Sequence, residues 1–139
     1  MLTNRRTILI EWGDCDPAGI VYFPQFFAHF DRCTFALFTH AGIDIYAMKQ
    51  SGEIAGIPMA DVRCRFHASA RYGDKVIVES SVSEFRRASF DVLHRLLIDD
   101  ELSVEGFETR IWCHYHPDDG KKLKAERIPE EIVEALSRD

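Results

Sequence analysis

The sequence predicts an α+β fold in which a five-stranded antiparallel sheet wraps around one long buried helix. Three observations point to this fold. A helical segment in the first third is apolar on nearly all sides, strand-like segments fill most of the second half, and short turns join most of them. Because one sheet around one helix leaves an open face and edge strands, we also expect copies of the chain to associate.

The chain begins with a strand and continues into the long helix. Residues 7–12 alternate between apolar and polar types, which predicts a strand with three side chains on one face, those of Ile8, Ile10 and Trp12. After a loop, Pro24 suits the first position of a helix and Gly42 suits its left-handed end. The apolar residues between them predict a buried helix; they are Phe26, Phe27, Phe30, Cys33, Phe35, Leu37, Phe38 and Ala41. A short helix follows, capped by Asp44 and ended by Gly52.

The rest of the chain is mostly strand. Four further strands are expected over residues 62–70, 75–85, 89–98 and 102–116. Residues 72–74 and 99–101 have the composition of turns, and Pro117 ends the last strand because it has no N–H to donate. An amphipathic helix over residues 129–136 completes the series.

Length and composition fit a single domain over residues 1–139, with 46% hydrophobic residues to form its core. The 17 basic and 23 acidic residues give a net charge of −6, which argues against nucleic acid as a partner. The sequence has no signal-peptide pattern and no apolar run of about 20 residues. We therefore expect a cytoplasmic protein with no membrane partner.

Cysteine and histidine spacing predicts no metal, disulfide or cofactor. The four cysteines are widely spaced without a C-x-x-C pair, so they are expected to be small core residues; they are Cys15, Cys33, Cys64 and Cys113. His114 and His116 share one face of the last strand, with His94 on a neighbouring strand, but no carboxylate or cysteine completes a metal site. We expect these three histidines to be structural surface residues.

Two carboxylates, Asp14 and Asp16, lie on a loop rich in proline and glycine directly before the long helix. Since Pro24 has no N–H, the Phe23 amide and the next few N–H groups are the donors at the positive end of that helix. A carboxylate here can attack a substrate or activate water while an amide stabilises the resulting oxyanion. The alternative is turn chemistry, because Asp before Pro is common in loops.

The run Gly13-Asp14-Cys15-Asp16-Pro17-Ala18-Gly19-Ile20-Val21, followed by Phe23-Pro24, resembles the active-site segment of hotdog-fold thioesterases of the 4-hydroxybenzoyl-CoA type. The resemblance extends through Gly56-Ile57-Pro58 and Phe85-Arg86-Arg87-Ala88-Ser89-Phe90. It implies that Asp16 is the nucleophile or the general base and that the Phe23 N–H polarises the thioester carbonyl. Asp14 would shape the loop.

The same resemblance implies a binding segment for coenzyme A. Arg86 and Arg87, with Ser89 beside them, would hold its phosphates, to which guanidinium groups are well suited. Ala88 stands where relatives carry lysine, which leaves open whether the substrate is a CoA ester or a carrier-protein ester. Without the resemblance, the two arginines would be read as a solvated surface pair.

The resemblance also implies that Asp31 and Ile57 contact the acyl group. Asp31 matches a pocket position associated with the polar end of the acyl group; its alternative role is a helix-surface carboxylate paired with Arg32 or Lys49. Ile57 stands where hydroxybenzoyl-specific relatives have threonine, which weakens the case for a para-hydroxyl group. The phenylalanine-rich helix still favours an aromatic acyl group.

The resemblance implies a homotetramer built from dimers. Together with the residues above, it predicts a cytoplasmic thioesterase that hydrolyses a 4-hydroxybenzoyl- or benzoyl-like CoA ester in aromatic degradation. One alternative is a short-chain acyl-CoA or acyl-carrier-protein thioesterase of the type associated with the Tol–Pal system. Another is a hotdog domain that binds CoA esters without turnover. A hotdog dehydratase is disfavoured because His29 and Asp31, two residues apart on a helix, point in different directions.

Overall fold

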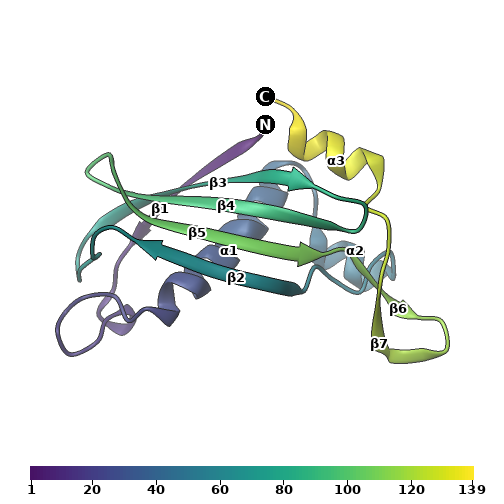
Figure 1. Ribbon diagram of the computed structural model, residues 1–139, viewed down its shortest axis with the longest axis horizontal. Coiled ribbons are helices and arrows are strands. Elements are labelled where there is room, and N and C mark those ends of the chain that lie inside the picture. Colours follow the sequence, from purple (N-terminus) through teal and green to yellow (C-terminus); the bar gives the residue numbers. More distant parts are fainter.

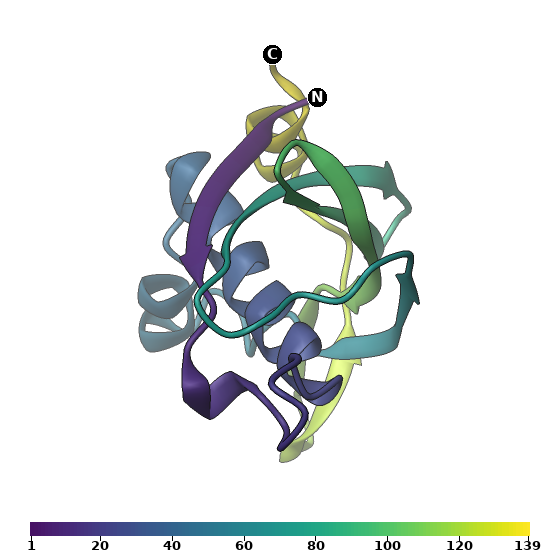
Figure 2. The same cartoon turned by 90° about the vertical axis from the view of Figure 1, so that its left-hand side faces the viewer.

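The computed structural model describes all 139 residues, and its centre is an antiparallel sheet in the order β1-β3-β4-β5-β2 (Figure 1). The strands are β1 (Thr3–Leu9), β2 (Met59–Phe66), β3 (Lys75–Phe85), β4 (Ser89–Ile98) and β5 (Glu101–Ile111). The sheet curls around helix α1 (Pro24–His40), as Figure 2 shows end-on. The predicted fold class is confirmed.

Helix α1 has the expected ends, with Pro24 at its first position and Gly42 at φ +83° just after it. Its buried side chains are Phe26, His29, Phe30, Cys33, Thr34, Leu37 and Phe38. A Cβ at Gly106 of β5 would lie 2.5 Å from the Phe30 ring, so a glycine there allows the helix to approach the sheet closely. The other side of the helix is more open, and Phe35 is 38% exposed.

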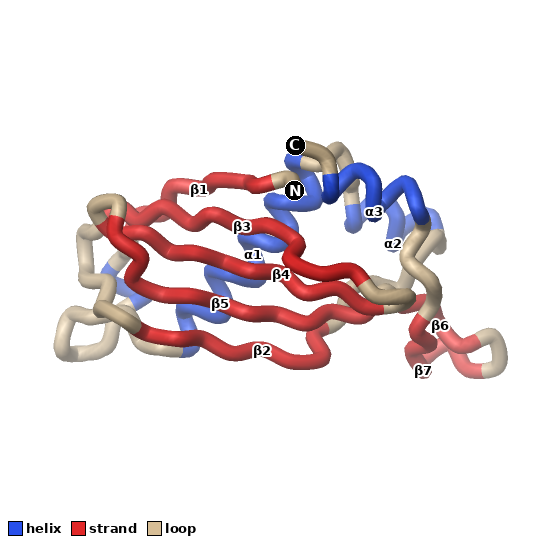
Figure 3. Tube along the Cα trace, turned by 45° about the horizontal axis from the view of Figure 1, so that its top comes forward, coloured by secondary structure: helices blue, strands red, loops and turns tan.

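Two short helices lie near the same end of the sheet (Figure 3). Helix α2 (Ile45–Ser51) is capped by Asp44, which accepts the Ala47 N–H at 2.9 Å, and ends at Gly52. Helix α3 (Glu130–Ser137) packs Ile132 and Leu136 into the core. Both helices were predicted. No helix is long and apolar enough to cross a membrane.

Three expected strands differ from the structure. The strand expected over residues 62–70 lies earlier, at β2, and ends at Phe66. The first strand lies earlier than predicted, at β1, and Trp12 is 62% exposed in a short 3₁₀ turn, packed edge-on against Tyr72. The last strand is divided at Trp112, whose N–H leaves the sheet to bond the Ala88 carbonyl at 2.8 Å. The remainder is β6 (Cys113–His116), which forms a separate hairpin with β7 (Asp119–Ala125) beyond the end of the sheet (Figure 3).

The turn between β4 and β5 consists of Asp99 and Asp100, which both have positive φ, +50° and +63°. This left-handed conformation at two consecutive residues suits a tight hairpin, but glycine or asparagine adopts it at lower cost than aspartate.

Strand β2 lies at the edge of the sheet with β5 as its only neighbour (Figure 3). Most of its side chains are exposed, including Val62 at 38% and Phe66 at 50%. An open edge with exposed apolar side chains is a surface that proteins usually cover.

Candidate active site

The loop with the two aspartates, residues 14–22, is a narrow hairpin that leads into α1. Cys15 and Val21 form an antiparallel bridge, and the Asp16 N–H donates to the Ile20 carbonyl at 2.9 Å. Gly19 turns the chain at φ +78°. We call this segment the Asp16 loop.

The Asp16 carboxylate is held by a single hydrogen bond. Its Oδ1 accepts the Ala18 N–H at 2.8 Å, and its Oδ2 has no partner within the chain. The residue is half-buried. One oxygen therefore remains available to a substrate or to water.

Asp14, in contrast, uses both carboxylate oxygens to fix the loop. Oδ2 accepts the Glu11 N–H at 2.9 Å, and Oδ1 lies 3.1 Å from Nε2 of His29, which is buried on α1. The Asp14 carbonyl accepts the Tyr22 N–H at 2.9 Å. Asp14 thus ties the Asp16 loop to the first turns of the helix.

The start of α1 leaves one backbone donor unused. The N–H groups of Gln25 and Phe26 already bond the carbonyls of Tyr22 and Phe23, at 2.8 and 3.1 Å. The Phe23 N–H donates to no acceptor within the chain. The sequence analysis expected several N–H donors at the start of α1. Of these, the Phe23 N–H is the one left without an acceptor, at the positive end of the helix.

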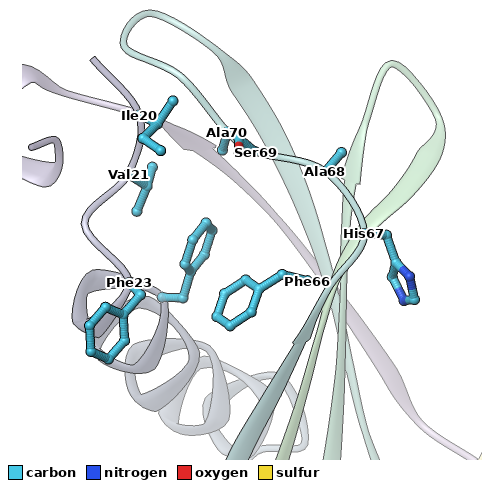
Figure 4. A pocket seen from close by; sticks show the side chains of 9 residues that line it. Ile20, Val21, Phe23, Phe66, His67, Ala68, Ser69 and Ala70 are labelled. Carbon is cyan, nitrogen blue, oxygen red and sulfur yellow. The ribbon is translucent and has the colours of Figure 1, made fainter. Parts of the chain in front are cut away.

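An apolar cavity of about 290 Å³ lies beside this donor; we call it the Phe23 cavity (Figure 4). Phe23 and Phe66 line it from opposite sides, and His67 points away. Its other lining residues come from the end of the Asp16 loop, from α1 and from the segment after β2: Ile20, Val21, Phe26, Ala68, Ser69 and Ala70. Asp16 itself does not line it.

Asp31 and Ile57 border a second, larger cavity of about 520 Å³, the Asp31 cavity. The Asp31 side chain is 51% exposed, and its Oδ1 lies 2.6 Å from Nη2 of Arg110 on β5. The alternative in which Asp31 pairs with Arg32 or Lys49 is not what the structure shows: Lys49 bonds the Ala55 carbonyl at 3.1 Å, and no ion pair forms with Arg32.

The Ile57 side chain does not shape the Asp31 cavity strongly, because the residue is only 4% exposed and packs into the core. Its carbonyl accepts a hydrogen bond from Nη1 of Arg110 at 3.1 Å.

Behind Arg110 lies a buried polar cluster that the sequence analysis missed. Arg110 Nε donates to Glu108 Oε1 at 2.8 Å, and the Thr34 hydroxyl donates to the same oxygen at 2.6 Å. His94 Nε2 lies 3.2 Å from Glu108 Oε2, and its Nδ1 lies 2.7 Å from the Ser80 hydroxyl. His94 is fully buried, so its expected place on the surface was wrong.

The opposite charges in this cluster stabilise one another in their ionised forms. Burial favours a raised pKa for the Glu108 carboxyl, but His94 and Arg110 outweigh it and hold that pKa below its ordinary value. Burial likewise favours a lowered pKa for Arg110, but Glu108 and Asp31 raise it. The alternation of residues along β5 could have predicted this cluster, because Glu108 and Arg110 share the inward face of the strand with Val104.

A third cavity, of about 570 Å³, contains Arg86 and Arg87 and also Arg127, which the sequence analysis did not single out. Arg86 is already engaged. Its two Nη atoms donate to the Asp91 carboxylate at 2.5 and 3.1 Å, and its Nε donates to Ser89 Oγ at 2.9 Å, so Ser89 helps to hold Arg86 in place. Arg87 and Arg127 make no ion pair or side-chain hydrogen bond within the chain. They are the two available cations of this arginine cavity.

The cysteines are all free thiols. Burial raises the pKa of Cys33 and that of Cys64 to about 11, which keeps both protonated. No group of three or more histidine, cysteine, aspartate or glutamate side chains is arranged to hold a metal ion.

The sequence and fold match known proteins over nearly the whole chain. The thioesterase-like superfamily matches residues 10–136. The 4-hydroxybenzoyl-CoA thioesterase of Pseudomonas sp. (strain CBS-3) is 31% identical over 135 residues, which cover 92% of this chain and 93% of that protein.

Solved structures give the same picture. The structure of 4-hydroxybenzoyl-CoA thioesterase from Pseudomonas sp. strain CBS-3 is similar with a TM-score of 0.85 and 27% identity, over 96% of this chain and 98% of that one. A mutant of 4-hydroxybenzoyl-CoA thioesterase with an aspartate replaced by asparagine, complexed with 4-hydroxybenzoyl-CoA, gives a TM-score of 0.87 and 27% identity, over 97% and 99%. A gentisyl-coenzyme A thioesterase, at 23% identity and a TM-score of 0.81, shares the fold.

Proposed function

This chain belongs to the thioesterase-like superfamily and is an acyl-CoA thioesterase of the 4-hydroxybenzoyl-CoA thioesterase type, and we propose that it hydrolyses an aromatic acyl-CoA with Asp16 and the Phe23 amide. The observation that carries the proposal is the pairing, on one short loop, of a carboxylate oxygen and a backbone N–H that are both without a partner. Water cleaves the thioester to a carboxylic acid and free coenzyme A.

The chemistry follows from those two groups. The Phe23 N–H, at the helix start, would bind the carbonyl oxygen as it becomes negative. Asp16 Oδ2 would either take a proton from the attacking water or attack the carbonyl carbon itself. In the second case the C–S bond breaks, the coenzyme A thiolate leaves, and water then opens the resulting anhydride. Both routes require the ionised carboxylate; they differ in whether a water lies between Asp16 and the carbonyl carbon.

Aromatic side chains support an aromatic acyl group. Phe23, Phe26 and Phe66 line the Phe23 cavity, and Phe35 lines the Asp31 cavity. Flat rings favour offset or edge-to-face contacts with other rings, which aliphatic chains cannot make. The 4-hydroxybenzoyl group of the Pseudomonas relative has this shape.

We propose that two protomers share each site. The Asp31 cavity includes residues 57–59 at the start of β2, and the Phe23 cavity includes residues 66–70 at its end. Antiparallel pairing of two β2 edges around a two-fold axis would bring the start of one strand beside the end of the other. The two cavities would then meet across the interface. Light scattering should give at least twice the 16.0 kDa protomer mass, and an active monomer would contradict the shared site.

The arginine cavity is the proposed site for the phosphates of coenzyme A. Arg87 and Arg127 are the side chains we assign, since Arg86 is already bonded to Asp91 and to Ser89. Arg87→Ala together with Arg127→Ala should raise KM for acyl-CoA but not for the matching N-acetylcysteamine thioester, which lacks the nucleotide. An equal rise for both thioesters would remove this assignment.

The central experiment measures free-thiol release from benzoyl-, hydroxybenzoyl-, acetyl- and hexanoyl-CoA by the wild type and by Asp16→Asn. We expect aromatic esters to be preferred and kcat/KM of the variant to fall by roughly 10²- to 10⁴-fold. Asp118→Asn, an exposed carboxylate on the β6–β7 hairpin, is the control and should match the wild type.

Three results would contradict the proposal in different ways. Full activity in Asp16→Asn would make the loop structural. A preference for the short aliphatic esters would favour a short-chain or carrier-protein thioesterase. Binding of CoA esters by the wild type without thiol release would indicate a non-catalytic domain.

A further inference from the structure

We propose that His29 is a positioning residue, which acts through Asp14 to hold the Asp16 loop against helix α1. This inference rests on the proposed function, in which Asp16 and the Phe23 N–H act on the same thioester, and it adds the residue that fixes these two groups relative to each other. His29 lies on the helix and Asp14 on the loop, 15 residues earlier in the chain.

The first step of the argument is that His29 has a single hydrogen-bond partner. Its Nε2 lies 3.1 Å from Asp14 Oδ1, and the two side chains are only 10% and 14% exposed. Because an ionised carboxylate only accepts hydrogen bonds, Nε2 is the nitrogen that carries the proton. The other oxygen, Oδ2, accepts the Glu11 N–H at 2.9 Å. Both oxygens are thus engaged, and the charged acceptor makes the contact with His29 stronger than a neutral hydrogen bond.

The second step is that residues 14–16 have no other hydrogen bond to α1. The far strand of the Asp16 loop is tied instead to the segment after β2, by the bonds from the Val21 N–H to the Ala70 carbonyl at 2.9 Å and from the Tyr72 N–H to the Gly19 carbonyl at 3.1 Å. These two bonds should keep the loop attached when His29 is lost. The strand that carries Asp16 would then be free to shift relative to the helix.

The third step is that α1 is the common reference for both reacting groups. The Phe23 N–H belongs to the residue directly before the helix, so it moves with the helix. The Asp16 carboxylate is fixed only within its own loop, because its partner is the Ala18 N–H. His29, in the second turn of α1, is where the strand that carries Asp16 is bonded to the helix. The distance from the carboxylate to the Phe23 N–H therefore depends on His29.

The size of the effect follows from the precision that the reaction requires. A displacement of about 1 Å between reacting groups can lower the rate by roughly 100-fold. The arginine cavity, which is proposed to hold the nucleotide, is built from other elements. Loss of the Nε2 donor should therefore lower kcat by roughly 10- to 100-fold and change KM by less than about threefold.

The test uses two variants of His29 that differ by one methylene group. In glutamine the side-chain amide nitrogen can reach the position of Nε2, whereas in asparagine it reaches only that of Nδ1. For the aromatic ester that the wild type hydrolyses fastest, His29→Gln should keep kcat within about threefold of the wild type, and His29→Asn should lower it by roughly 10- to 100-fold. Rescue by glutamine alone distinguishes a donor to Asp14 from a side chain that only fills space.

The matched control is His40→Asn. His40 is exposed in the last turn of the same helix and makes no side-chain hydrogen bond or ion pair. This variant should therefore match the wild type in both kcat and KM. Urea unfolding of each variant shows whether it is folded.

Asp14→Asn breaks the same contact from the side of the loop. Its amide keeps one acceptor oxygen but turns an NH₂ group toward either the Glu11 N–H or His29 Nε2. We expect kcat to fall as in His29→Asn. Combining the two changes should cause no further fall, because they break one contact.

The wild type offers a measurement that does not depend on how the variants fold. Proton–nitrogen NMR spectra of its imidazole groups should show a proton on Nε2 of His29 at neutral pH. A His29 with its only proton on Nδ1 could not donate to Asp14, and this result would overturn the inference.

The kinetic results separate the two proposals. Equal kcat in His29→Gln and His29→Asn, a change confined to KM, or additive losses in the double variant would overturn the role of His29. If Asp16→Asn still loses its activity in that case, the proposed function stays in place. Failure of the wild type to hydrolyse any aromatic ester would overturn the proposed function itself.

Discussion

Asp16 and Asp31 are two partly exposed aspartates next to the same helix, and the chain holds them in opposite ways. Asp16 lies on a hairpin loop and accepts one N–H, that of Ala18. Asp31 lies within α1 and is bonded to Arg110, which is itself anchored by Glu108 in the core. The difference is informative because a carboxylate that reacts needs an unengaged oxygen, whereas one that recognises a ligand needs a fixed direction.

The largest effect is expected from breaking the support behind Asp31. Glu108→Gln leaves the buried Arg110 guanidinium with Asp31 as its only charged partner, so the free energy of unfolding should fall by about 3 kcal/mol. Urea unfolding measures it.

The matched control for this change is Glu105→Gln on the same strand. Glu105 pairs with His67 and Arg65, whose side chains are 41% and 60% exposed, so its loss should cost less than about 1 kcal/mol. Equal losses for the two variants would show that the Asp31 region does not depend on buried charge.

A smaller effect is expected from loosening the Asp16 loop. Asp14→Ala removes the acceptor for the Glu11 N–H and the contact with His29, which should lower the free energy of unfolding by about 1–3 kcal/mol. Thiol release should fall as well, since Asp16 loses its fixed position although its carboxylate is intact. Activity equal to the wild type in this variant would mean that the loop keeps its shape without Asp14.

The smallest effect concerns Asp91 and Arg86, which repeat the Asp31–Arg110 pairing near the surface. The hydrogen bonds from Arg86 are the main cause of a lowered Asp91 pKa, against an ordinary value of 3.8. The pair therefore adds stability above that ordinary value, and the contribution is lost as the pH falls through the lowered pKa.

Asp91→Asn tests this pH dependence. Its free energy of unfolding should lie less than about 1 kcal/mol below that of the wild type at neutral pH, and the gap should close as the pH falls below about 4. Unfolding curves recorded between pH 2 and pH 7 would show it. A gap that stays constant with pH would mean that the ion pair adds nothing.

Local signals in the sequence predicted much of the fold. Pro24 and Gly42 mark the ends of α1, and the bounds of β3 and β4 agree with the prediction because their inner faces alternate strictly with solvent-facing positions. Strand β7 was missed because all its side chains are exposed, so its composition of charged residues resembles a loop. Alternation of apolar and polar residues, which the mostly exposed β2 has and β7 lacks, is what predicts a strand here.

The candidate site likewise has a part that local sequence signals identify and a part that they do not. Asp16 and the Phe23 amide lie on one short segment, so motif and punctuation identify them, and their catalytic roles stay predictions. The pairing of Asp31 with Arg110 joins a helix to a distant strand, and no local pattern records such a contact. Alternation along β5 is consistent with an inward Arg110, but the sequence analysis did not single it out and gives no sign of which partner it meets.

The Asp99–Asp100 turn is a position at which the stability of the molecule could be increased. Both residues hold a left-handed conformation at a cost that Asn-Gly would largely avoid, about 1 kcal/mol for each position. Neither residue lines any of the three cavities. A chain with Asn-Gly at this turn would have a larger free energy of unfolding and would therefore tolerate heavier alteration of its buried charges before it unfolds.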